Sequence, residues 1–138
     1  MATGVAGHQA RDLVTQQVHY LRKTVAYNTD GIGTGVKMSH PVPAGAHILA
    51  AYARISTGFN SAGTNRLVVG TNSTSFNNIM TSTTAAASTT GGKQSVIGGA
   101  LSFTQATDVF IKYTAATGTA ATAGVATITV AYVPNNDA

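Results

Sequence analysis

The sequence predicts an all-β protein: an antiparallel β-sandwich, jelly-roll-like in its pattern, preceded by a short N-terminal arm. Residues with a branched β-carbon are abundant, with 22 Thr, 13 Val and 7 Ile among 138 residues, and such residues fit pleated sheets better than helices. Short alternating segments recur between turns rich in Gly, Asn and Thr, which is typical of sandwiches. The length fits one domain, so we expect an arm over 1–17 and a single β-sandwich domain over 18–138.

The first element is the arm. Residues 1–17 contain Gly4 and Gly7 and few large apolar side chains. We therefore expect this segment to be flexible alone and to order on a neighbouring molecule.

The first strand is predicted over 18–27, because its residues alternate between two faces. One face would carry Leu21, Lys23, Val25 and Tyr27, and the other Tyr20, Arg22, Thr24 and Ala26. A turn is expected over 28–35, where Asp30 and Gly31 tolerate a positive φ.

A short strand around 36–38 leads to a connection over 41–45, since its two prolines cannot donate to a central ladder. Residues 46–58 are predicted to form a strand, although their alanines leave a helix as the alternative. Strict alternation would place Ile48, Ala50, Tyr52 and Arg54 on one side and Leu49, Ala51, Ala53 and Ile55 on the other.

Further along, a loop is expected over 60–65 and a strand over 66–69, stopped by Gly70. Residues 71–95 carry no clear pattern. Their centre, 81–92, is poor in sequence complexity and has no large side chain, so we expect an exposed, mobile loop there. A short strand is predicted over 100–103.

The last two strands are predicted over 108–114 and 124–133, joined by a hairpin loop over 115–123. In the first, Val109, Ile111 and Tyr113 would share a face opposite Phe110 and Lys112. In the second, one face would carry Ala126, Ile128, Val130 and Tyr132, and the other Val125, Thr127, Thr129 and Ala131.

The composition argues against catalysis. Only 9% of the residues are charged, the acids are four aspartates without any glutamate, and there is no cysteine. General acid–base chemistry and structural zinc sites need such groups in clusters. The histidines match no zinc spacing; they are His8, His19, His40 and His47. We therefore expect no enzyme and no catalytic, cofactor-binding or metal-binding residues.

Two further patterns are read as structural. The run Gly31-Ile32-Gly33-Thr34-Gly35 lacks the remaining glycine or lysine of a phosphate-binding loop, so it is interpreted as a flexible turn. The tyrosines could stack on sugars, but each falls in a predicted strand, so core or subunit interface is the favoured interpretation; they are Tyr20, Tyr52, Tyr113 and Tyr132. The eight basic residues are scattered, which argues against a nucleic-acid footprint.

The chain resembles small structural proteins of tailed bacteriophages, of the head decoration (cement) type. The resemblance covers roughly residues 36–133. It rests on PAGA at 43–46, ISTGFN at 55–60, NRLVVGT at 65–71, the aromatic strand at 109–114 and the closing strand at 126–133.

This resemblance implies a virion structural protein, made in the host cytoplasm and bound to the outer capsid surface. As a cement protein it would assemble with itself, as a homotrimer, and with the major capsid protein, and it would bridge capsid subunits through residues 1–17 and loops at one end of the sandwich. No nucleic acid, membrane or small-molecule substrate is expected as a partner. The alternatives are a neck, tail or head-fibre component and a carbohydrate-binding sandwich that uses Tyr20, Tyr52 or Tyr113.

Overall fold

The computed structural model describes residues 18–72, 75–81, 86–115 and 120–134, and these form a sandwich of two antiparallel sheets. The strands are β1 (His19–Ala26), β2 (Val36–Lys37), β3 (His47–Thr57), β4 (Arg66–Gly70), β5 (Gly91–Ser102), β6 (Phe110–Thr114) and β7 (Val125–Val133). The predicted all-β sandwich is confirmed. A jelly-roll connectivity stays a prediction, as does the arm over 1–17, which lies outside the described residues.

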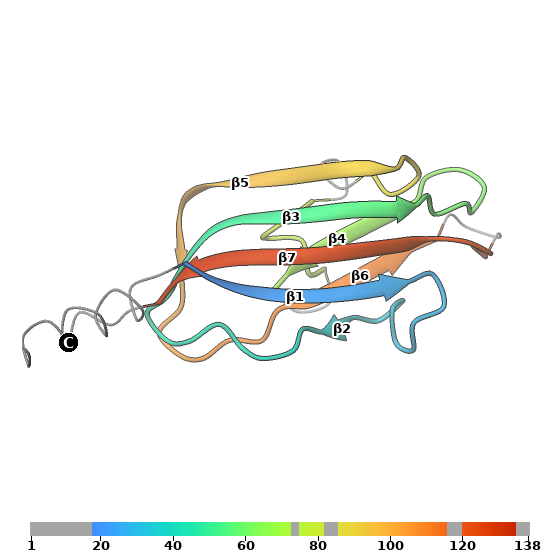
Figure 1. The fold of residues 1–138 in the computed structure, drawn as a ribbon. Coiled ribbons are helices and arrows are strands. Elements are labelled where there is room, and N and C mark those ends of the chain that lie inside the picture. Colours follow the sequence, from blue (N-terminus) through green and yellow to red (C-terminus); the bar gives the residue numbers. More distant parts are fainter. Residues whose placement is uncertain (1–17, 73–74, 82–85, 116–119, 135–138) are drawn as a thin grey trace, which may run out of the picture.

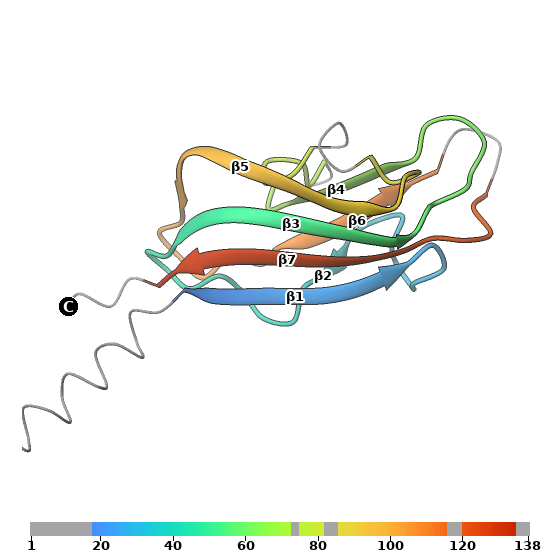
Figure 2. The same cartoon turned by 45° about the horizontal axis from the view of Figure 1, so that its top comes forward.

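The larger sheet has the strand order β1-β7-β3-β5, and the smaller sheet has the order β2-β6-β4. Figures 1 and 2 show the larger sheet as one layer, with the smaller sheet lying behind it. The edges of the larger sheet are therefore β1 and β5, while β7 and β3 are central. Among the described residues, no helix is long and apolar enough to span a membrane.

The core lies between the two sheets. β7 occupies the centre of the larger sheet, and its inward residues Ala126, Ile128 and Val130 are completely buried. Leu67 and Ile111 are equally inaccessible on the smaller sheet. Alternation of side chains along each strand places these residues on one face and polar residues on the other. The faces predicted for the strands at 18–27, 108–114 and 124–133 are confirmed.

β3 corrects one predicted alternation. The strand prediction over 46–58 is right, but the register shifts between Ile48 and Ala50 where β3 pairs with both of its neighbours. Such a bulge inserts an extra residue, so Ile48 is 3% exposed while Leu49 is 45% exposed. Strict alternation had placed Ile48 on the side of Tyr52, which is the outer face, and Leu49 on the side of Ile55, which is the inner face.

The segment around β5 corrects a second prediction. A 12-residue strand runs over Gly91–Ser102 and pairs antiparallel with β3, where only 100–103 had been predicted as strand. The expected exposed loop over 81–92 is also partly wrong, because Ala87 is fully buried and its carbonyl accepts a hydrogen bond from the Phe59 amide at 2.9 Å. Residues 82–85 of that loop lie outside the described part of the chain.

Candidate functional site

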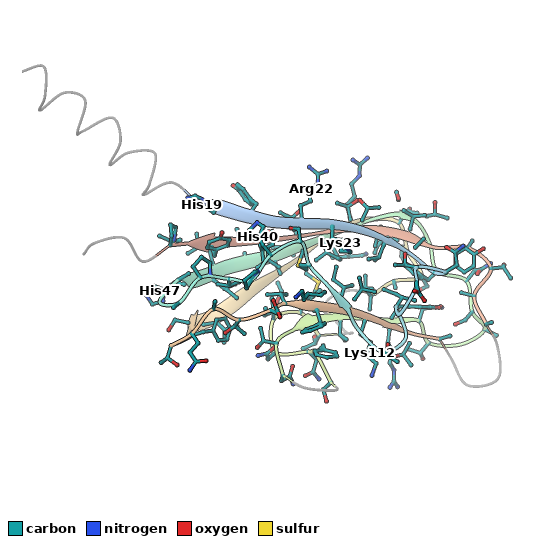
Figure 3. The ribbon with its side chains drawn as sticks, turned by 90° about the horizontal axis from the view of Figure 1, so that it is seen from below. His19, Arg22, Lys23, His40, His47 and Lys112 are labelled. Atoms are coloured by element: carbon teal, nitrogen blue, oxygen red, sulfur yellow. The ribbon has the colours of Figure 1, made fainter. Side chains whose placement is uncertain are left out.

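The outward face of the larger sheet carries two identical Tyr-x-Arg patterns. Tyr20 and Arg22 project from β1, and Tyr52 and Arg54 project from β3; all four side chains are exposed. Residues two apart on a strand share a face, so each pattern places a ring and a guanidinium side by side. Figure 3 shows Arg22 on the side of β1 opposite to Lys23.

Strand register brings the two patterns together. One row across the sheet consists of Arg22, Thr129, Tyr52 and Gln94. The next row consists of Thr24, Thr127, Arg54 and Gly92. The hydroxyls of Thr24 and Thr127 share a hydrogen bond of 2.9 Å. Strand spacing and rise put the two arginine α-carbons roughly 12 Å apart.

Exposed hydrophobic side chains gather on the same face. Four large hydrophobic residues of the described chain are strongly exposed, namely Val18, Tyr20, Leu49 and Tyr52. Tyr20 and Tyr52 point outward by alternation, and the bulge in β3 turns Leu49 outward, while Val18 precedes β1. We call the surface formed by Tyr20, Leu49 and Tyr52 with Arg22 and Arg54 the Tyr/Arg face.

The Tyr/Arg face is hollowed where polar and apolar groups meet. An open depression of about 790 Å³ lies over it, lined among others by Arg22, Tyr52, Arg54, Gln94 and Thr129. Threonines of β7 separate the β1 residues from the β3 residues. A side chain projecting from another molecule can therefore enter between the two arginines.

Acidic groups lie away from the Tyr/Arg face. Within the described ranges the acids are Asp30, in the turn after β1, and Asp108, just before β6. Asp108 pairs with Lys37 of β2, with the ammonium nitrogen 3.5 Å from a carboxylate oxygen. The two arginines thus make the Tyr/Arg face positively charged, with no described acid on it to offset them.

The smaller sheet presents a different outer surface. Its exposed cation Arg66 lies on β4, and Lys112 lies on the central strand β6. The ring of Phe110 is covered by Phe76, with the centroids 4.7 Å apart. Phe76 has a φ of 47°, a strained value for a bulky residue. On this sheet the chain itself covers its outer aromatic ring.

In the described part of the chain, the histidines form no metal site. His19, His40 and His47 lie toward the end of the sandwich where β1 begins (Figure 3), and each is exposed. The ring of His19 stacks on Tyr132 at 5.7 Å. His8 lies outside the described residues. In the described ranges no group of three or more His, Asp or Glu side chains could hold a metal ion.

The glycine-rich run is a turn, as expected. Gly31 has a φ of 77° and its carbonyl accepts hydrogen bonds from the amides of Thr34 and Gly35, at 3.0 and 2.9 Å.

The tyrosines divide into a buried and an exposed group. Tyr113 and Tyr132 are each 4% exposed, so Tyr113 is excluded as a sugar platform, whereas Tyr20 and Tyr52 remain available on the outer face.

Comparison with solved structures links this fold to phage capsids. A chain in the capsid asymmetric unit of cyanophage Pam1 superposes with a TM-score of 0.62 and is 25% identical; the match covers 86% of this chain and 85% of that chain. The similarity to the Pam1 chain supports the interpretation of this chain as a virion structural protein. A chain of the acid-stable capsid of Helicobacter pylori bacteriophage KHP30 has a TM-score of 0.56 at 14% identity, covering 86% and 89% respectively. This second likeness shows a shared fold.

No protein-family model matches the chain, and no curated protein matches its sequence. The structural neighbours therefore carry the comparison. The likeness to the Pam1 chain supports the bacteriophage capsid part of the predicted resemblance and suggests a structural rather than an enzymatic role. The sequence indicated a core or subunit-interface position for Tyr20 and Tyr52, with a sugar platform as the alternative, but it assigned no role to Arg22 and Arg54. The repeated Tyr-x-Arg spacing at 20–22 and 52–54 was the available signal.

Proposed function

We propose that this chain is a capsid decoration, or cement, protein that binds the outside of a phage head and stabilises it by bridging capsid subunits. The observation that carries the proposal is the likeness to the Pam1 capsid chain over most of both chains. The composition supports it. Burying unpaired charges under neighbouring proteins would cost free energy, and only 9% of the residues of this chain are charged.

The proposed mechanism is adhesion. Each copy buries area across a joint between capsid subunits, so rupture of the shell must also break the contacts of the bridging protein. We propose a homotrimer on the outer capsid surface, with residues 1–17 and the loops at one end of the sandwich among its contacts. Three linked copies would bind more tightly than one because of their effective concentration.

Cosedimentation with phage heads tests this function. Heads of the phage that encodes the chain, prepared without it, should bind the added protein in hundreds of copies and resist heat or chelation better than bare heads. Deleting residues 1–17 should weaken binding. A full-length protein that never cosediments with the heads would contradict the proposal.

Copy number separates this role from its structural alternative. A neck, tail or fibre component would be present in about a dozen copies or fewer, as a ring or an axial oligomer, and would not saturate the head surface. Quantitative gel analysis of purified virions measures this directly, and light scattering on the isolated protein tests the trimer.

A further inference from the structure

We propose that the Tyr/Arg face docks onto an acidic protein surface, whose carboxylates pair with Arg22 and Arg54 while an apolar group covers the tyrosines. This inference rests on the proposed function and sharpens it, since it names the surface of the sandwich that contacts the shell and the chemistry that the shell must offer. It adds a sheet face to the contacts expected of residues 1–17 and the end loops.

The distribution of apolar groups marks this face. Of the four strongly exposed large hydrophobic residues of the described chain, Tyr20, Leu49 and Tyr52 lie on it, and Val18 directly precedes β1. On the outer surface of the smaller sheet, by contrast, Phe76 stacks on Phe110 and the segment that follows is held by a bridge between Val69 and Met80. A gathered, uncovered apolar patch with a polar rim is a mark of an interaction site.

The choice of cations points the same way. The two cations that project outward on the Tyr/Arg face are arginines. Lys23 and Lys93 lie on the inward side of the edge strands, although Lys93 also borders the depression. Tyr and Arg are enriched at protein interfaces and dominate their binding energy, while Lys is depleted. A guanidinium also donates two parallel hydrogen bonds to a carboxylate, which an ammonium cannot do.

Charge identifies the occupant. A second copy docking by the same face would bring two pairs of arginines together, which is unfavourable. Another surface of a second copy offers few carboxylates, because the described acids are Asp30 and Asp108, and Asp108 already pairs with Lys37. An acidic surface of a different protein satisfies both the arginines and the apolar patch.

A sugar fits this face less well. Sugar hydroxyls call for convergent side chains that both accept and donate hydrogen bonds. The lining of the depression includes Gln94 and threonine hydroxyls but no carboxylate. Two arginines roughly 12 Å apart instead match two carboxylates on a folded protein surface.

The area of the face explains why several copies would be needed. Strand spacing and rise give a sheet face of roughly 500 Å², which is less than the ~800 Å² per partner of an independently stable interface. A single copy would therefore bind weakly. Linked copies bound to adjacent acidic sites would gain avidity.

The test uses the full-length protein and heads of the encoding phage prepared without it. The double variant R22Q/R54Q should lower the apparent affinity by at least about tenfold. It should also reduce the salt dependence of binding, since carboxylate–arginine attraction is screened by added salt. The variant R22K/R54K keeps the charge but cannot donate two parallel hydrogen bonds to one carboxylate. It should bind with an affinity between those of the wild type and R22Q/R54Q.

Matched controls separate this effect from general charge loss. K37Q/R66Q removes the same charge from the smaller sheet and should bind like the wild type. The variant Y20T/Y52T should weaken binding without changing its salt dependence. Thermal unfolding of each free variant must match the wild type within a few degrees, so that lost binding reflects the surface.

Three outcomes overturn the inference. If the wild type binds heads and R22Q/R54Q binds equally well, the Tyr/Arg face is not the contact, although the decoration function stands. If the wild type never binds heads, the proposed function and this inference fall together. If a glycan array shows binding that Y20T/Y52T abolishes while head binding is unchanged, the face is a sugar site.

Discussion

Tyr113 donates its phenolic proton to the side-chain oxygen of Asn65 across the core, with the two oxygens 2.5 Å apart. The same oxygen accepts the hydroxyl of Ser61 at 2.7 Å and the amide of Ser61 at 3.1 Å. Asn65 is 6% exposed, so these bonds replace the hydrogen bonds to water that its side-chain amide loses on burial. The network anchors the loop after β3 to the strand β6.

Removing the phenolic hydroxyl should cost a moderate amount of stability. Tyr113→Phe is expected to lower the free energy of unfolding by about 1 kcal/mol, because the Asn65 oxygen keeps its Ser61 donors. Asn65→Ala should cost about 2–3 kcal/mol, because the buried Tyr113 hydroxyl then loses its acceptor. Urea unfolding measures both. In the Asn65→Ala background Tyr113→Phe should cost almost nothing; an additive double variant would contradict the direct coupling.

Gly124 should not tolerate a side chain. Its φ is +147°, and an added β-carbon would lie 2.5 Å from ring atoms of Phe59, which itself packs on Tyr113 with ring centroids 4.4 Å apart. We expect Gly124→Ala to destabilise the fold by about 2 kcal/mol or more. Gly33→Ala is the matched control, since nothing lies within 4 Å of its added β-carbon. It should be neutral or slightly stabilising, and equal losses at the two sites would contradict the prediction.

The lysines of the edge strands should oppose self-association. Lys23 lies on the inward side of β1 and Lys93 on that of β5, at the two edges of the larger sheet. Inward charges hinder the pairing of an open edge with another chain. The variant K23V/K93V should therefore form larger species than the wild type at the same concentration in light scattering, without loss of folding stability. Lys112→Val, on the central strand β6, should not; if it associates as strongly, edge protection is not the cause.

Tyr132 should make stability fall at alkaline pH. Burial raises the pKa of the Tyr132 hydroxyl above its ordinary value of 10.0, because the folded environment disfavours the phenolate. Above pH 10 the unfolded chain loses this proton first, so the full stability present below pH 10 declines as the pH rises toward the folded pKa. Tyr132→Phe should flatten that decline in urea unfolding from pH 9 to 11. Tyr20→Phe, the same change at an exposed position, is its control, and an unchanged slope in Tyr132→Phe would contradict the assignment.

Much of the fold was predictable because most of its strands alternate regularly. β7 places β-branched or aromatic residues inward at 128, 130 and 132 and threonines outward at 127 and 129, and a period of two admits one orientation of such a strand. β5 was not predictable. Its first half contains two glycines and polar residues, which carry no hydrophobic period, and its pairing with β3 is a long-range contact.

The candidate surface divides in the same way. The sequence alone determined the fold class, the scarcity of acids and the alternation that puts Tyr20 with Arg22 and Tyr52 with Arg54, because these depend on composition and on the period of a strand. The tertiary structure decided that the two pairs share one face, because register sets β1 and β3 on either side of β7. It also decided that Leu49 joins them, since a bulge adds a residue that strict alternation does not anticipate.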